Sequence, residues 1–140
     1  MGRPAKFWHK NLQTAPNKSR VINNYACQLM EKKDWETAIT ELKKAIEIQP
    51  NYDDARYNLG TCYMELKKWQ ECIEELTLSL KINSQMANAH NNLGICIAEG
   101  RKDYLTATNE FAEAIRLNPN DESFYRNLKI ATMRLQEQKR

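Results

Sequence analysis

Glycine and proline are scarce in this sequence, with four residues of each among 140. Because both residues dominate turns and interrupt helices, their scarcity leaves little room for loops and favours a mostly helical chain. Long apolar runs are also missing, and none approaches the roughly 20 residues of a membrane-spanning helix. The N-terminus lacks the apolar stretch of a secretory signal peptide. We therefore expect an intracellular protein without a membrane span, located preferably in the cytoplasm. The alternative is a mitochondrial location, which the acid-poor N-terminus suggests.

Acidic residues are absent from residues 1–20, which carry five basic residues. The other 120 residues hold 16 basic and 18 acidic groups, a net charge of −2, so the overall charge of +3 comes from the N-terminal segment. A general nucleic-acid-binding domain would show a basic stripe across its whole surface. The distribution favours a basic arm that is solvated or bound to protein, and an RNA-associated arm is the lesser alternative.

Metal-ligand patterns are missing as well. The four cysteines form no CxxC pair and have no nearby histidine, so we expect no metal site. Nine residues separate Cys62 from Cys72, a spacing that also occurs in disulfide-linked helical hairpins, but the second pair of such hairpins is absent. We therefore expect free, mostly buried thiols in a reducing compartment, with a disulfide between Cys62 and Cys72 as the alternative.

Catalytic motifs are absent too. The sequence contains no HExxH, no GxSxG and no dinucleotide-binding glycine pattern. One histidine, His9, lies on the N-terminal arm, and the other, His90, falls at a helical position where core packing is expected. We predict that the chain is not an enzyme, binds no cofactor and has no small-molecule substrate.

Residues 1–18 show no helical period and contain two prolines. Their apolar part is Phe7 and Trp8, side chains that are costly to leave in water. We expect this arm to pack either on the first helix of its own chain or on a neighbouring subunit.

Beyond the arm, the sequence repeats itself. Leu59 and Leu93 are 34 residues apart, as are Trp35 and Trp69, whereas Leu93 and Leu128 are 35 residues apart. Repeats of this length are typical of stacked helical hairpins. The predicted units are 19–52, 53–86 and 87–121, followed by a single helix over 122–140. The extra residue of the third unit is placed most simply in a turn over 99–102, a turn to which Gly100 would then belong.

The repeated pattern resembles the tetratricopeptide repeat family, which has Leu-Gly and Tyr on the first helix and Ala, Phe and Pro on the second. The residues that match are Leu59, Gly60, Tyr63, Leu93, Gly94, Ala107, Phe111 and Pro119. The leading aromatic of the family is missing from the three predicted hairpins, where its positions hold Ile22, Arg56 and His90. It is present in the last helix as Tyr125. The resemblance covers residues 19–137 and implies an all-α, right-handed solenoid of three hairpins with a capping helix.

Small residues explain how paired helices could approach each other. We expect Gly60 to face Cys72 and Gly94 to face Ala107 across each hairpin. A large side chain at these positions would overpack the hairpin.

Asparagine recurs with the same period. Asn24, Asn58, Asn92 and Asn127 each precede the Leu-Gly position, at spacings of 34, 34 and 35. The resemblance places them on the concave face, where an amide can both donate to and accept from a peptide backbone. Further candidate side chains near this face are Tyr57, Asn88 and Asn91. The alternative is that asparagine is simply the family's favoured residue at this position.

Family members that bind chaperones hold a C-terminal carboxylate with a clamp that includes three cations. The equivalent positions here are Asn23, Cys27, Asn58, Asn88 and Asn92, of which only Asn58 matches. A carboxylate would therefore be poorly compensated, and a chaperone-binding role is not expected. We predict a non-catalytic protein–protein interaction module that acts as an adaptor or structural subunit of a larger assembly. The alternative is a receptor for an extended peptide, bound through the asparagines.

Overall fold

The computed structural model describes residues 18–140, so the predicted arm residues Phe7 and Trp8 lie outside the described part of the chain. Within residues 18–140 the chain forms seven helices and no strand. The first helix covers residues 18–31. The others are α2 (Trp35–Ile48), α3 (Asp53–Glu65), α4 (Trp69–Ile82), α5 (Ala87–Arg101), α6 (Tyr104–Leu117) and α7 (Glu122–Gln138). The prediction of an all-α fold is confirmed.

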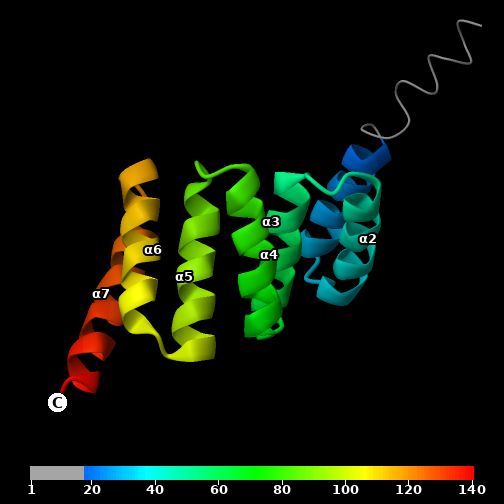
Figure 1. The fold of residues 1–140 in the computed structure, drawn as a ribbon. Helices are drawn as coiled ribbons and strands as arrows, with labels where there is room; N and C mark the ends of the chain where they lie inside the picture. Colours follow the sequence, from blue (N-terminus) through cyan, green and yellow to red (C-terminus); the bar gives the residue numbers. More distant parts are fainter. Residues whose placement is uncertain (1–17) are drawn as a thin grey trace, which may run out of the picture.

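The helical hairpins follow one another along the stack, from residues 18–31 and α2 at one end to α7 at the other (Figure 1). Helix α3 pairs with α4, and α5 pairs with α6, while α4 packs on α5 and α6 on α7. First helices of successive hairpins also touch, since α3 contacts α5 and α5 contacts α7. Each hairpin therefore completes its core with its neighbours, which is the predicted α-solenoid.

The turn inside each hairpin has the same local cause. A lysine with left-handed backbone conformation ends the first helix, at Lys33 (φ 62°), Lys67 (φ 60°) and Lys102 (φ 54°). In the third hairpin the next residue, Asp103, accepts a hydrogen bond from the backbone N–H of Thr106 at 3.1 Å. The carboxylate caps the free N–H groups at the start of α6. The chain reversal is thus encoded within a few residues.

The extra residue of the third hairpin lengthens a helix, and the prediction of an insertion in the turn is wrong. Helix α5 continues to Arg101 and has 15 residues, whereas α3 has 13. Gly100 therefore lies in the last turn of α5, where a Cβ would collide with the side chain of Trp69 on α4. The lengthened end of α5 packs on Trp69 because glycine lets the two backbones approach.

The glycines inside the hairpins meet large side chains, which corrects a second prediction. A Cβ built on Gly60 would lie 2.7 Å from Cγ of Leu76, and one on Gly94 would lie 2.7 Å from Cε1 of Phe111. The partners are therefore Leu76 and Phe111, which lie one helical turn beyond Cys72 and Ala107. Glycine here makes room for a large core side chain, because the missing Cβ leaves a hollow that the side chain fills.

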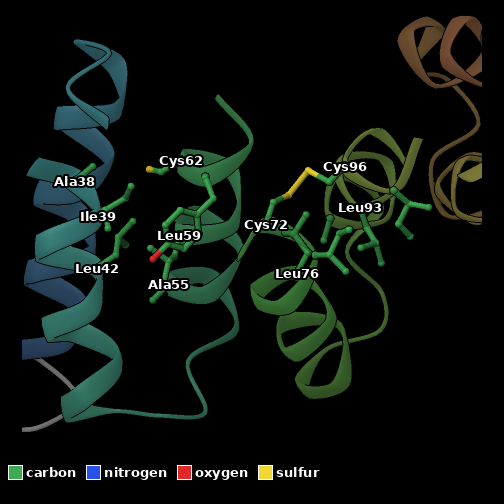
Figure 2. Close-up of a cluster of buried hydrophobic side chains, with 14 of the residues drawn as sticks. Ala38, Ile39, Leu42, Ala55, Leu59, Cys62, Cys72, Leu76, Leu93 and Cys96 are labelled. Atoms are coloured by element: carbon green, nitrogen blue, oxygen red, sulfur yellow. A yellow bond between two sulfur atoms is a disulfide. The ribbon is translucent and has the colours of Figure 1, made fainter. Parts of the chain in front are cut away.

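One core runs along the whole stack. Figure 2 shows Ala38, Ile39 and Leu42 of α2 pointing toward Ala55, Leu59 and Cys62 of α3, and Cys72 and Leu76 of α4 pointing toward Leu93 and Cys96 of α5. All of these side chains are buried. The core thus joins one hairpin to the next and positions the first helices beside one another.

Candidate functional site

The candidate site is the surface formed by the first helix of each hairpin together with α7, which we call the first-helix face. Four asparagines occupy equivalent positions on its four helices: Asn24, Asn58, Asn92 and Asn127. We call them the asparagine row. Asn24 is exposed, Asn127 is partly buried, and Asn58 and Asn92 are each only 9% exposed. The structure thus places the row along the stack, with its two central members deepest.

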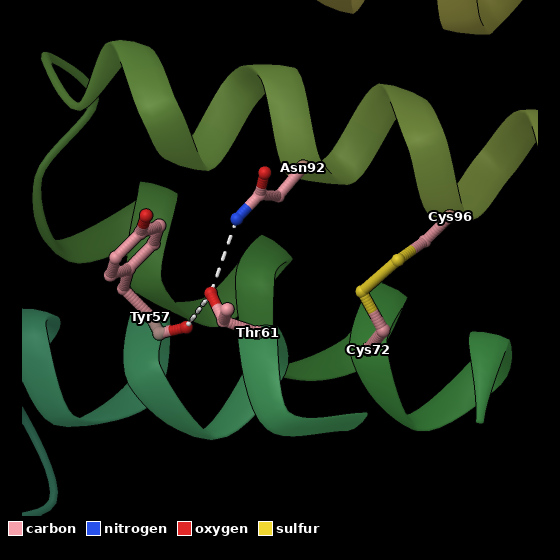
Figure 3. Close-up of a disulfide and its surroundings, with 5 residues drawn as sticks. All are labelled: Tyr57, Thr61, Cys72, Asn92 and Cys96. Atoms are coloured by element: carbon pink, nitrogen blue, oxygen red, sulfur yellow. Dashed lines mark hydrogen bonds between the residues drawn. A yellow bond between two sulfur atoms is a disulfide. The ribbon is translucent and has the colours of Figure 1, made fainter. Parts of the chain in front are cut away.

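The central amides connect neighbouring helices. The Nδ2 group of Asn58 donates to Oδ1 of Asn23 at 3.0 Å and to Sγ of Cys27 at 3.4 Å, both on the helix of residues 18–31. The Nδ2 group of Asn92 donates to Oγ1 of Thr61 on α3 at 3.1 Å (Figure 3). Each amide therefore joins its helix to the preceding first helix.

Asn127 repeats this arrangement at the C-terminal end. Its Nδ2 group donates to Oδ1 of Asn91 on α5 at 2.9 Å. Asn91 is buried, so it serves as an acceptor beneath the surface and does not stand in the row itself. Part of the asparagine row is thus structural, as a buried polar group needs a partner.

The carbonyl oxygens of the row are left for another donor. The side-chain hydrogen bonds of Asn58, Asn92 and Asn127 all use Nδ2. Among the residues of 18–140 that are not exposed, every buried side-chain nitrogen or oxygen has a hydrogen-bond partner. The Oδ1 atoms therefore keep access to the surface. Both N–H groups of Asn58 are used.

Tyr57 and Asn88 lie at one edge of the face. Together with Asp54, Met86 and Ala87 they line a pocket of about 330 Å³ between α3 and α5. Burial raises the pKa of Tyr57 above its ordinary value, so the phenol keeps its proton. This edge offers a neutral hydroxyl and an exposed amide.

A second pocket contains residues that the sequence analysis missed. It measures about 220 Å³, lies between α5 and α7, and is lined by Ile95, Ala98, Glu99, Tyr104, Phe111, Asn127, Ile130, Ala131 and Arg134. We call it the α5–α7 pocket. A signal was present, since Cys27, Thr61, Ile95 and Ile130 recur at 34, 34 and 35 residues, three positions after the asparagine row.

The opposite edge of the face carries acids, which the sequence analysis also missed. Glu31, Glu65 and Glu99 hold equivalent positions at the ends of three first helices, and all three are exposed. We call them the acidic row. The fourth position, on α7, is occupied by Arg134. This edge of the face is therefore negative on three helices and positive on α7.

The side chains that replace the missing family aromatic make the same polar contacts in two successive hairpins. Arg56 donates from Nε to the carbonyl oxygen of Pro50 at 2.9 Å and from Nη1 to Oε1 of Glu75 at 2.9 Å. His90 lies at the equivalent place, with Nε2 3.1 Å from the carbonyl oxygen of Ser84 and Nδ1 2.8 Å from Oε1 of Glu110. These side chains fasten the loop between hairpins to both helices of the hairpin that follows it.

This contact makes the stability depend on pH. The hydrogen bond to Glu110 raises the pKa of His90 above its ordinary value of 6.5, aided by the Ser84 carbonyl and opposed by burial. The stabilisation should be complete below pH 6.5 and disappear as the pH rises through the higher folded-state value. We expect the free energy of unfolding to fall over that range. In the variant His90→Arg this fall should vanish, since Arg56 makes the same contacts with a permanent charge; equal slopes would contradict the prediction.

The cysteines correct the expectation of four free thiols. Cys72 of α4 and Cys96 of α5 form a disulfide between the second and third hairpins (Figure 3). The sequence analysis considered only Cys62 with Cys72, within one hairpin, whereas stacking brings the second helix of one hairpin against the first helix of the next. Cys62 and Cys27 are free, and burial raises the pKa of Cys62 to about 12, so its thiol is unreactive.

Residues 18–140 hold neither a cluster of metal-ligating side chains nor a membrane-spanning helix. Between residues 18 and 140 no group of three or more histidine, cysteine or acidic side chains is arranged to hold a metal ion. In the same part of the chain no helix has the length and apolarity needed to cross a membrane.

Comparisons with known proteins agree with this geometry. A TPR repeat model matches residues 28–66 and a tetratricopeptide repeat model matches residues 53–86. No curated protein matches the sequence. Several solved tetratricopeptide repeat domains are similar in fold. The first TPR of Spaghetti (RPAP3) bound to the HSP90 peptide SRMEEVD has 18% identity and a TM-score of 0.81 over 85% of this chain and 94% of its own.

Two human domains are similar in the same way. The first TPR domain of human RPAP3 has 18% identity and a TM-score of 0.83 over 89% of this chain and 97% of its own. The second TPR domain of human RPAP3, in complex with the HSP70 peptide SGPTIEEVD, has 15% identity and a TM-score of 0.78 over 84% of this chain and 98% of its own. At these identities the likeness concerns the fold. Residues 28–86 thus match models of the tetratricopeptide repeat, and the stacked hairpins have the fold of tetratricopeptide repeat domains.

Proposed function

We propose that this chain is a non-catalytic adaptor or structural subunit of a larger assembly, and that it holds an extended segment of a partner protein on its first-helix face. The observation that carries the proposal is the asparagine row, whose carbonyl oxygens accept no hydrogen bond from residues 18–140. A row of acceptors along stacked helices matches the row of N–H groups that an extended peptide displays. Two similar domains are solved with peptides bound, which supports a protein partner.

The spacing of the row suits an extended backbone. Neighbouring packed helices lie about 8–10 Å apart. An extended chain advances about 3.3 Å per residue. A segment that crosses the first helices would therefore meet one asparagine about every three residues. Asn58 and Asn92 would each accept a hydrogen bond from a backbone N–H of the segment.

The bound segment is proposed to lie within a chain and not at its C-terminus. The equivalents of the chaperone-binding cations are Asn23, Asn88 and Asn92, which carry no positive charge. A terminal carboxylate would lose its hydration here without gaining a cation. The peptides SRMEEVD and SGPTIEEVD are thus poor candidates for this face.

The double variant Asn58→Ala/Asn92→Ala tests the proposal. Peptides would first be selected from a random display library by the unmodified protein. Loss of two acceptors should weaken those peptides about tenfold or more, since each hydrogen bond contributes about 0.5–1.5 kcal/mol. Binding would be measured by fluorescence anisotropy.

Two controls separate binding from folding. Asn109→Ala removes an exposed asparagine from α6, away from the first-helix face, and should leave the affinity unchanged. Circular dichroism of the double variant should retain the helical signal, although the lost contacts to Asn23 and Thr61 will lower its stability. Failure to select any peptide, or an unchanged affinity of folded Asn58→Ala/Asn92→Ala, would contradict the proposal.

A further inference from the structure

We infer that the segment bound on the first-helix face carries a basic side chain about three residues from an aliphatic one, with the basic group beside Glu65 and Glu99 and the aliphatic group in the α5–α7 pocket. This inference rests on the proposed function and adds the chemistry of the partner. Three features of the face support it: the acidic row, the apolar pocket and the position of the neighbouring cations.

The acidic row lacks internal neutralisation. Glu31, Glu65 and Glu99 take part in none of the ion pairs within residues 18–140. They repeat at 34-residue intervals on helices that stand side by side. Like charges in a row repel one another, and a cationic side chain laid along them removes this repulsion. A basic segment is therefore favoured and an acidic one is disfavoured.

The α5–α7 pocket supplies the apolar contact beside this row. Its walls include Ile95 and Ile130, and Ile130 is 48% exposed although it is a large aliphatic residue. A volume of about 220 Å³ accommodates a leucine- or methionine-sized side chain better than an aromatic pair. Covering Ile130 would remove apolar surface from water at about 25 cal/mol per Å².

The charges around the pocket set the order of the two groups. Glu99 and Arg134 both line the pocket, one from α5 and one from α7. A cation beyond α7 would meet Arg134, so the basic side chain lies on the α3 side of the aliphatic one. Since first helices lie about 8–10 Å apart, the two groups are about three residues apart in the sequence of the ligand. The charged residues on the face as a whole are Arg20, Glu31, Asp54, Glu65, Glu99 and Arg134.

Blocked peptides of equal length test this inference. Each peptide has one leucine and, three residues before or after it, one lysine, glutamine or glutamate. The peptide SRMEEVD serves as an acidic comparison. We expect the best lysine peptide to bind at least about tenfold more tightly than its glutamate counterpart, from two partly exposed charge contacts. Raising the salt concentration should reduce this difference.

Three variants locate the effect. Glu65→Lys/Glu99→Lys should reverse the preference to the glutamate peptide, whereas Glu47→Lys on α2, an equally exposed glutamate off the face, should not. In the unmodified protein the lysine peptide should bind more tightly than a version with alanine in place of leucine. The variant Ile130→Gln should abolish this difference in affinity. All four positions are exposed, so the variants should fold.

The outcomes separate this inference from the proposed function. Equal binding of the lysine and glutamine peptides, or tightest binding of SRMEEVD, would overturn the inference. The proposed function would still stand if the peptides selected from the library remained sensitive to Asn58→Ala/Asn92→Ala. Preference for lysine that reverses in Glu65→Lys/Glu99→Lys supports both.

Discussion

Reduction of the Cys72–Cys96 disulfide is expected to lower the free energy of unfolding by about 3 kcal/mol. The bridge joins residues that are 24 positions apart, so it closes a loop that the unfolded chain would otherwise leave free. Closing a loop of this size removes conformational entropy from the unfolded state, and the native state gains by comparison. The midpoint of chemical unfolding should shift to lower denaturant when a reductant is present.

The double variant Cys72→Ala/Cys96→Ala should lose a similar amount and should no longer respond to the reductant. Cys27→Ser, which alters a thiol outside the bridge, should keep the full response. Alkylation in denaturant counts the free thiols directly, with two expected before reduction and four after it. Four reactive thiols in protein purified without reductant would show that the bridge does not form.

The variant Phe111→Ala is expected to cost about 3–5 kcal/mol, the usual cost of truncating a buried phenylalanine. Phe111 is 2% exposed, and its ring fills the hollow above Gly94. The free energy of unfolding of small domains is only about 5–15 kcal/mol, so this single change should remove a large part of the stability. Leu105→Ala on the same helix is the control, because Leu105 is 59% exposed and should change little.

Gly94→Ala probes the same contact from the other side. In the unmodified chain the new Cβ would collide with the Phe111 ring, so the variant should be destabilised. In the Phe111→Ala background the ring is gone, and the same change should stabilise α5 by up to about 1 kcal/mol, the helix-propensity difference between alanine and glycine. The change of sign is the test. Additive effects would show that Gly94 and Phe111 do not contact each other.

The fold could be predicted from the sequence because its signal is repeated. Apolar residues at helical spacing, such as Leu59 and Leu93, return after 34 residues, so each hairpin supports the assignment of the next. Two of the three errors arose where one hairpin meets another, whereas the partners of Gly60 and Gly94 were misassigned within a hairpin. The partner of Cys72 is Cys96 in the following hairpin, and Gly100 is placed by Trp69 of the preceding one. Contacts of this kind depend on how hairpins stack, which no spacing within a single hairpin reveals.

The candidate site was predictable in position but not in detail. The period of the sequence was enough to align Asn58 with Asn92, and the structure places both on the first-helix face. Which amide atoms remain available depends on local neighbours such as Asn23 and Thr61, whose distances the sequence does not contain. The acidic row and Ile130 carry the same period and were missed because they lie outside the family's pattern of matching residues.

The disulfide also bears on how the array comes apart. In a linear stack each hairpin is held only by its neighbours, so unfolding normally starts at an end and spreads inward one repeat at a time. A covalent link between α4 and α5 merges the second and third hairpins into a single cooperative unit. The first hairpin is joined to that unit by packing and by hydrogen bonds such as Asn58 to Asn23. We expect it to exchange its amide hydrogens by a separate, earlier opening, so that the N-terminal third of the stack frays while the linked centre stays closed.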